Sequence, residues 1–419
     1  MSALSRLDGL WRHPDFLKLW LGQTVSLGGS LVSRIAIPLV AIITLSASPG
    51  EVAMLRVAES LPGVLIGLFA GVWVDRFRRR RLMIWADLGR AALLISVPLA
   101  ALLGALHIWH LALVILAAGT LSALFEVAYH AYLPTLVSRA ELVEGNSKLE
   151  ASGAVVEVVS FGLAGWLVQT LTAPLAIVPD AVSFVVSALC LGTIRTPEPT
   201  IERPAAEQST FRAMREGMRL LLRDPILRAI AGAQATARLF MYVWFTMYLV
   251  FLTRDLQLEP VVFGIVFAVG GICSFVGAMC AERIAHRLGL GPTLIVTLLL
   301  FSLSLLAVPL ASSPFLLVVL LVTTQQLADG AGTVLQIHES SLVQAIVPDH
   351  ALGRVTASLR VIGWTAMLAG TVIGGVLGEL IGPRMTLLVG AIGSLPAVLW
   401  LVWSPVRGLR TLPQLDVTA

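Results

Sequence analysis

The stretch Gly71-Val-Trp-Val-Asp75-Arg76-Phe77-Arg78-Arg79-Arg80-Arg81 connects an apolar run to a cluster of five arginines. The residues before it, 52–74, and after it, 82–105, are mostly apolar. About 20 apolar residues are enough for one helix to cross the hydrocarbon core of a membrane. Because arginine is costly in hydrocarbon, the cluster must lie at a membrane surface. The stretch therefore predicts two membrane-spanning helices joined by a short basic loop.

Apolar runs of this length recur along the whole chain. We expect twelve membrane-spanning helices, at about 17–45, 52–74, 82–105, 109–137, 149–171, 174–194, 226–252, 260–281, 292–311, 314–346, 355–381 and 384–404. Of the 419 residues, 57% are hydrophobic and 13% are charged, and the mean hydropathy is +0.89. This composition excludes an ordinary cytosolic enzyme, a disordered protein and a nucleic-acid binder.

The sequence contains no motif for a cofactor or a metal. Cys190, Cys273 and Cys280 lie singly in apolar runs, so we interpret them as small apolar residues rather than as disulfide or metal-binding partners. The glycines near 270–277 and 289–291 have no P-loop lysine behind them. We therefore predict no cofactor, no metal site and no catalytic residues. The first eighteen residues also lack the apolar core of a cleavable signal peptide.

One long polar interval divides the runs into two groups of six. Its arginines at 212, 215, 219 and 223 recur every three or four residues, which predicts an amphipathic helix with a basic face. We therefore predict an N-terminal six-helix bundle at 1–194, a linker at 195–225 and a C-terminal six-helix bundle at 226–419. The two halves resemble each other weakly at offsets of 210 and about 207 residues, which indicates a parallel repeat.

The stretch 71–81 resembles the loop 2–3 signature of the major facilitator superfamily, in which a glycine is followed by Asp-Arg and then by a basic pair. Residues 16–40, 133–147 and 347–355 are similar to the drug-exporter branch that includes macrolide and siderophore exporters. The resemblance implies the major facilitator fold, an all-α membrane protein with twelve transmembrane helices in two pseudo-symmetric six-helix bundles. It also implies a bacterial inner or plasma membrane and a cytoplasmic gate motif at Gly71, Asp75, Arg76, Arg79 and Arg80.

Ionisable side chains inside the apolar runs are candidates for function, because charges in hydrocarbon are costly. In the first half these are Arg34, Glu126 and Glu157. Tyr129 and His130 follow Glu126 by three and four residues and share its side of a helix. A carboxylate in hydrocarbon can hold a proton near neutral pH, so we predict that Glu126, or else Glu157, carries a coupling proton. The alternative is a static ion pair with Arg34; His130 is expected to be solvated rather than a proton relay.

Five further polar residues are interpreted as follows. Asp329 lies mid-span among small residues and is expected to bond to a broken or tightly packed helix, with proton coupling as its second possible role. His338 and Glu339 are expected to be solvated near the cytoplasmic exit. Arg56 and Glu59 are three residues apart and predict a local ion pair.

An aromatic stripe runs along the seventh expected span. Phe240, Trp244 and Tyr248 recur at every fourth residue and share one helical side. Such a surface suits a large apolar or cationic ligand. Side chains that face lipid or the membrane interface would show the same spacing, so the sequence leaves both interpretations open.

These features predict a secondary transporter that rocks two bundles about a central site and exports a hydrophobic or amphipathic, drug-like small molecule in exchange for protons. We expect a monomer surrounded by membrane lipid, with no nucleic-acid partner and no enzymatic activity. One alternative is the export of a siderophore or a lipid-like metabolite. An alternative of another class is a non-transporting membrane sensor or scaffold on the same fold.

The distribution of basic residues predicts the orientation, because positive charges concentrate on the cytoplasmic side. With both termini inside, the cytoplasmic segments contain most arginines and lysines, and the outer side contains at most Arg56, Arg254 and Arg384. Single cysteines in the linker 195–225, in a cysteine-free background, should react only with a cytoplasmic thiol reagent. Cysteines near Ser48 or Ser312 should react only from outside. Labelling of the linker from outside would contradict this orientation.

Overall fold

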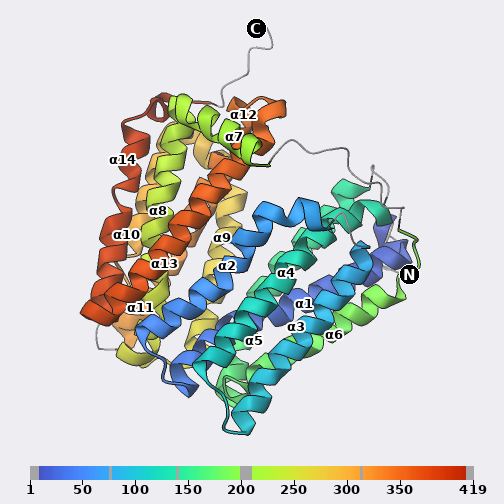
Figure 1. Ribbon diagram of the computed structural model, residues 1–419. Helices are drawn as coiled ribbons and strands as arrows, with labels where there is room; N and C mark the ends of the chain where they lie inside the picture. The colour runs from blue at the N-terminus through green and yellow to red at the C-terminus, as the bar shows by residue number, and fades with distance from the viewer. Residues whose placement is uncertain (1–8, 75–77, 138–140, 199–209, 312–314, 412–419) are drawn as a thin grey trace, which may run out of the picture. The chain divides into compact units, whose positions relative to one another are not determined.

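The computed structural model describes residues 9–74, 78–137, 141–198, 210–311 and 315–411, and every regular element in these ranges is helical (Figure 1). Water is absent from hydrocarbon, so a lipid-embedded backbone must bond its own N–H and C=O groups, and helices do this within one segment. The α-helices of the first half are α1 (Pro14–Leu39), α2 (Pro49–Val74), α3 (Arg79–Leu102), α4 (Ile108–Leu136), α5 (Leu142–Leu171) and α6 (Val178–Thr193). They are followed by α7 (Thr210–Arg223), α8 (Pro225–Val250), α9 (Pro260–Leu288), α10 (Leu290–Ser304), α11 (Phe315–Leu327), α12 (Asp329–Ile346), α13 (Asp349–Ser394) and α14 (Ala397–Val402).

Many of these helices have the length and composition of membrane spans. Within the described ranges, eight helical stretches are long and apolar enough to cross a membrane. The longest, Ala351–Val402, contains Gly382, whose φ of +80° interrupts α13 before Pro383. The expected spans 355–381 and 384–404 meet at this break. The all-helical membrane class is therefore confirmed, and the number of twelve spans stays a prediction.

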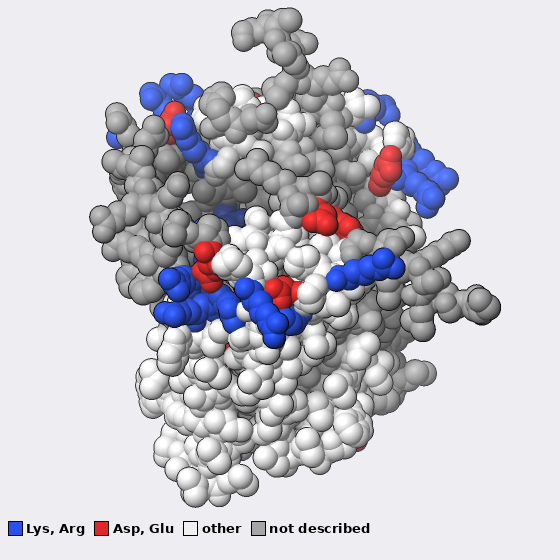
Figure 2. Space-filling model, turned by 90° about the vertical axis from the view of Figure 1, so that its right-hand side faces the viewer, with Lys and Arg blue, Asp and Glu red and all other residues white. Residues whose placement is uncertain are grey.

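Charged side chains are unevenly distributed on the molecular surface. On the face drawn in Figure 2, the described charged residues form a band, and a broad surface below the band carries almost none. Large apolar side chains are exposed instead, among them Trp85 and Trp109, each 72% exposed. A surface of this kind is stable in contact with lipid and would aggregate in water.

The chain divides into two compact units. Unit 1 contains residues 1–47, 55–205 and 259–268, and unit 2 contains residues 48–54, 206–258 and 269–419. In unit 1, α1 packs against α5 and α6, and α3 packs against α4 and α6. In unit 2, α13 packs along α8 and α7, and α10 packs against α12. The main division, between residues 205 and 206, falls inside the expected linker; the predicted domain boundaries themselves stay a prediction.

Helix α1 of unit 1 and helix α8 of unit 2 have the same local design. Helices α1 and α8 each have 26 residues, a proline in the first turn and a capping side chain before it, His13 or Asp224. Each continues into a five-residue π-helical turn, at 40–44 and 251–255, and each turn is followed by a residue with positive φ, Ser46 at 51° and Gln257 at 50°. Corresponding residues are 211 positions apart, so a parallel repeat close to the expected offset is present in the backbone.

The expected amphipathic helix in the linker is α7, which lies on α13 within unit 2. Leu221 of α7 is fully buried, and Arg354 of α13 donates from Nη1 to Glu216 Oε2 at 2.7 Å. A Cβ atom on Gly217 would lie 2.3 Å from the carbonyl oxygen of Arg354, so the two backbones are in direct contact. Arg215 and other basic residues of α7 are exposed. The apolar side of α7 therefore packs on protein.

Two glycines provide a matched test of this contact. Gly217→Ala should lower the free energy of unfolding by about 1–3 kcal/mol, because the added methyl group must push α7 away from α13. Gly353→Ala, on α13 with open space around its Cβ position, should be neutral or stabilising by up to about 1 kcal/mol. Thermal unfolding of the purified variants in detergent measures both. Equal effects of the two substitutions would contradict the close contact at Gly217.

Candidate functional site

Three ionisable side chains are buried together in unit 1. Asp87 and Arg90 of α3 and Asp180 of α6 are 0%, 6% and 2% exposed. Asp87 and Arg90 are three residues apart, so they share one side of α3, and they form an ion pair. The carboxylate of Asp180 accepts hydrogen bonds from the hydroxyls of Ser30 and Ser183, each at 3.3 Å. We call Asp87, Arg90 and Asp180 the buried charge cluster.

The guanidinium group of Arg90 is the centre of this cluster. Its central carbon lies 3.9 Å from the ring centroid of Phe184 and 4.6 Å from that of Phe125. Its Nη1 donates to Ser122 Oγ at 3.2 Å. A desolvated cation gains about 2 kcal/mol from a contact of this kind with an aromatic face. Because the cluster contains one guanidinium and two carboxylates, it is neutral when it holds one proton and has a charge of −1 when it holds none.

Helix α1 reaches the buried charge cluster because it has glycine at the point of contact. A Cβ atom on Gly29 would lie 2.3 Å from Ser183 Oγ and 2.8 Å from Asp180 Oδ1. Any larger residue would separate α1 from α6. The close approach of the two helices places Ser30 within hydrogen-bond distance of Asp180.

The predicted coupling residues of the first half lie apart from this cluster. Arg34, Glu126 and Glu157 are exposed. Among the described residues, Arg34 forms no ion pair with either carboxylate, so the static pair is not formed in this structure. Tyr129 is half-buried beside His130, with 5.5 Å between their ring centroids, and His130 is exposed. The role of Glu126 in coupling stays a proposal.

The expectation for His338 and Glu339 is wrong. They are 9% and 8% exposed, so both side chains are buried within unit 2. The carboxylate of Glu339 accepts a hydrogen bond from Gln234 Nε2 of α8 at 2.9 Å. His338 Nε2 lies 3.0 Å from the carbonyl oxygen of Ala281 in α9. Unit 2 therefore contains a buried carboxylate, Glu339, that accepts a hydrogen bond from a polar partner.

Asp329 lies at a helix break, as expected. Helix α11 ends at Leu327 and α12 begins at Asp329. At the break, α12 touches α9 closely, since a Cβ atom on Gly277 would lie 2.4 Å from the carbonyl oxygen of Gly330. Gln326, just before the break, donates to the hydroxyl of Tyr248 at 3.4 Å. Transporters commonly bind substrates or ions where a spanning helix is interrupted.

The aromatic stripe is part of the interior of unit 2. Trp244 and Tyr248 are 3% and 1% exposed, and their rings stack with centroids 4.6 Å apart. The Trp244 indole donates to the carbonyl oxygen of Leu305 at 3.0 Å. The ring of Phe240 fills the space at Gly393. The lipid-facing interpretation is therefore wrong for Trp244 and Tyr248, and the substrate-facing one stays a proposal.

The gate motif is described only in part. Gly71 belongs to α2, while Asp75 and Arg76 lie outside the described residues. Arg79 and Arg80 begin α3 and are half-buried.

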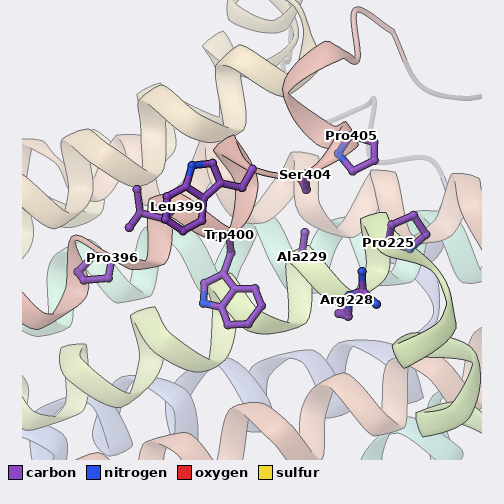
Figure 3. Close-up of a pocket in the computed structure, with 9 residues that line it drawn as sticks. Pro225, Arg228, Ala229, Pro396, Leu399, Trp400, Ser404 and Pro405 are labelled. Atoms are coloured by element: carbon purple, nitrogen blue, oxygen red, sulfur yellow. The ribbon is translucent and has the colours of Figure 1, made fainter.

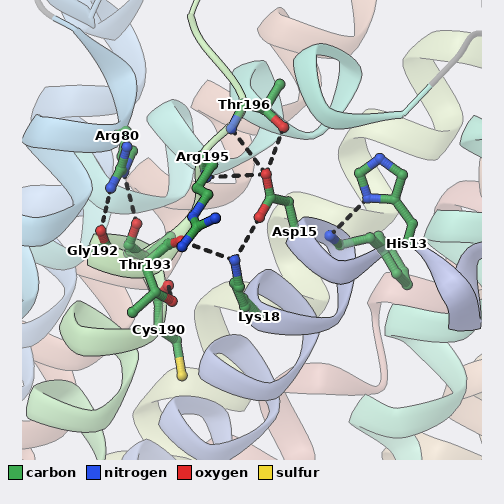
Figure 4. Close-up of polar contacts among 11 residues, drawn as sticks. His13, Asp15, Lys18, Arg80, Cys190, Gly192, Thr193, Arg195 and Thr196 are labelled. Carbon is green, nitrogen blue, oxygen red and sulfur yellow. Dashed lines mark hydrogen bonds and ion pairs between the residues drawn. The ribbon is translucent and has the colours of Figure 1, made fainter.

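Arg80 holds the end of α6 (Figure 4). Its guanidinium donates to the carbonyl oxygen of Leu191 at 2.7 Å and to that of Gly192. Lys18 Nζ donates to the next carbonyl, of Thr193, at 2.9 Å. The last carbonyls of a helix have no partner within the helix and attract positive charge. Arg80 therefore anchors α3 to α6.

Asp15, in the first turn of α1, binds the segment that follows α6. Its Oδ2 accepts from the backbone N–H groups of Arg195 and Thr196 at 3.0 and 2.9 Å, and its Oδ1 pairs with Lys18 at 2.7 Å (Figure 4). The chain that leaves α6 is thus bound to the start of α1.

Asp87 and Arg90 were not among the predicted site residues. Both lie in the expected span 82–105. The available signal was an acidic and a basic residue three positions apart inside an apolar run.

The ion pair expected between Arg56 and Glu59 is confirmed, with 3.2 Å between Arg56 Nη1 and Glu59 Oε2. Within the described ranges, no group of three or more His, Cys, Asp or Glu side chains could hold a metal ion, and the three cysteines are free.

Known proteins resemble this chain in sequence and in fold. The multidrug efflux pump Tap of Mycolicibacterium fortuitum is 25% identical over 390 residues, which cover 90% of this chain and 92% of that protein. Macrolide efflux protein A of Streptococcus pyogenes is 27% identical over 232 residues, 55% of this chain and 56% of that protein. A bacterial homologue of the iron transporter ferroportin shares the fold, with a TM-score of 0.77 and 16% identity over 94% of this chain and 99% of that one.

The family model described as transmembrane secretion effector matches residues 8–415, nearly the whole chain. The buried charges, the broken helix and the apolar spans agree with the transport function of that family. The chain is therefore an integral membrane protein of the transmembrane secretion effector family, within the major facilitator superfamily of transporters.

Proposed function

We propose that this transporter exports hydrophobic or amphipathic, drug-like small molecules in exchange for protons. The efflux proteins among its relatives support drug export, and the buried charge cluster supports coupling to protons. We further propose twelve spans in two six-helix bundles, a monomer in a bacterial inner membrane and both termini in the cytoplasm. Alternating access would then consist of rocking one bundle against the other.

The single observation that carries the coupling proposal is the burial of one cation, Arg90, together with two carboxylates, Asp87 and Asp180, in unit 1. A charge in a dry protein interior is costly unless it is paired. The cluster has one positive and two negative groups, so binding one proton removes its net charge. A change in water access to unit 1 would then load or release that proton.

Glu126 is the second candidate for the coupling proton. Its carboxylate is exposed, so water or a cationic substrate could reach it without a change in packing. Approach of a positive charge would favour loss of a proton from this carboxylate. Glu157 is a third candidate for the same reasons.

Within unit 2, the proposed substrate contacts lie around the helix break before Asp329. Gln326, Tyr248 and Asp329 supply hydrogen-bonding groups there, and the neighbouring aromatic rings supply an apolar surface. Asp329 could also hold a proton. The gate motif at Gly71, Asp75, Arg76, Arg79 and Arg80 would control opening on the cytoplasmic side, with Arg80 keeping the ends of α3 and α6 together.

Two other functions compete with this proposal. Export of a siderophore or a lipid-like metabolite would use the same coupling and differ only in substrate. A non-transporting sensor or scaffold would gain little from a buried cluster with one cation and two carboxylates, because apolar packing of the same volume is as stable or more stable. The cluster therefore favours transport.

Proteoliposomes with an imposed pH gradient test the coupling. Asp180→Asn keeps the size of the side chain but cannot take up a proton, and we expect gradient-driven accumulation of erythromycin or tetraphenylphosphonium to fall at least about tenfold. Exchange of labelled for unlabelled substrate without a gradient should persist, because binding does not need the proton. Glu59→Gln is the matched control, since Glu59 is a half-exposed carboxylate paired locally with Arg56.

Glu126→Gln, measured in parallel, decides between the two candidate sites. Loss of gradient-driven transport only in this variant would assign the coupling proton to Glu126. Normal pH-driven transport in both variants would contradict the proton coupling proposed for either site. Loss of exchange together with accumulation would indicate a structural role.

A further inference from the structure

A groove of about 470 Å³ lies in unit 2, between the start of α8 and the segment 396–405 that includes α14 (Figure 3). Its size is within the range of small-molecule sites. The lining comes from the first turn of α8, from α14 and from the short helix Pro405–Gly408 that follows it. These residues are Pro225, Arg228, Ala229, Pro396, Leu399, Trp400, Trp403, Ser404 and Pro405.

The wall of the groove is built around Trp400. Its indole lies flat against α8, where a Cβ atom on Gly232 would be only 2.4 Å from the ring. The indole Nε1 donates to Thr236 Oγ1 at 3.1 Å, which fixes the plane of the ring. Trp403 is 78% exposed at the rim, and Leu399 is 41% exposed beside it. The groove thus opens onto an apolar surface suited to acyl chains.

The polar end of the groove has one charged group. Arg228 is exposed, and in the described part of the chain no acidic side chain pairs with it. The nearby carboxylate of Asp224 is used as a helix cap, since its Oδ1 accepts from the N–H groups of Ile226 and Leu227 at 2.8 and 2.9 Å. Each of the three lining prolines lacks an N–H group. The guanidinium is therefore the main donor offered to a ligand.

The position of the groove in the fold points to the membrane interface. Tryptophan side chains collect where hydrocarbon meets headgroups, and both exposed indoles lie at the end of the last apolar helix. Arg223, Arg407 and Arg410 are exposed in the adjoining segments, so the region attracts anions. Basic pockets between spanning helices at this level bind anionic lipid headgroups. By contrast, a groove of about 690 Å³ in unit 1 is lined only by uncharged residues.

We propose that this groove binds one anionic phospholipid, with its phosphodiester on Arg228 and its glycerol and acyl chains along Trp400, Trp403 and Leu399. The guanidinium supplies parallel N–H donors that match phosphate oxygens. A zwitterionic lipid has the same phosphate but adds a cation, which Arg228 and the surrounding arginines repel. The site therefore selects phosphatidylglycerol over phosphatidylcholine.

Native mass spectrometry of the purified full chain, titrated with each lipid, tests the proposal. We expect tighter binding of one phosphatidylglycerol molecule than of phosphatidylcholine. Arg228→Gln should weaken phosphatidylglycerol binding about tenfold, and Trp403→Ala, at an exposed position, should weaken both lipids. The matched control is Arg287→Gln, because Arg287 is also an exposed arginine at the end of a membrane-length helix but lines no groove. Thermal unfolding in detergent confirms that the variants are folded.

Three results would overturn the proposal. Equal loss of phosphatidylglycerol binding in Arg228→Gln and Arg287→Gln would show a general electrostatic attraction. Binding of glycerol phosphate as tightly as phosphatidylglycerol would show a simple anion site. Loss of macrolide binding, rather than of lipid binding, in the Arg228→Gln variant would show that the groove binds transported molecules.

Discussion

The absence of water from the hydrocarbon core is the constraint on which the structure depends. Every backbone group in the spans must be bonded within the protein, and the chain meets this requirement with helices alone in the described ranges. The same constraint applies to side chains. Arg90 is buried only because Asp87, Ser122 and two aromatic rings surround it. The burial of this charge therefore depends on partners whose arrangement can support function.

Helix ends and breaks are where backbone groups lose their partners, and polar side chains collect there. Arg80 and Lys18 bond the last carbonyls of α6, and Asp224 bonds the first N–H groups of α8. The break before Asp329 lies beside the hydrogen bond between Gln326 and Tyr248. Helix ends and breaks therefore matter for both stability and function, because the side chains that bond an interrupted helix can also bind a ligand.

Close contact between helices depends on glycine, because apolar side chains gain little from leaving lipid for each other. Gly29 lets α1 reach Asp180, and Gly277 lets α9 reach the break beside Gly330. Both polar sites are therefore built on backbone contacts. The two halves also share local structure, because the N-terminal cap, the proline in the first turn and the π-helical turn of α1 recur in α8 after 211 residues.

The sequence by itself determined the membrane class, most helix positions, the amphipathic helix α7 and the family, because hydropathy, charge position and the 71–81 stretch depend on neighbours in the chain. It also indicated a broken or tightly packed helix at Asp329 and predicted the pair of Arg56 with Glu59. Only the tertiary structure decided which charges are buried. Asp180 lies 90 residues from Arg90 in sequence, and Glu339 is buried beside Gln234 of α8 although a solvated side chain was expected at its position. Burial depends on which helices pack together, and no local pattern contains that information.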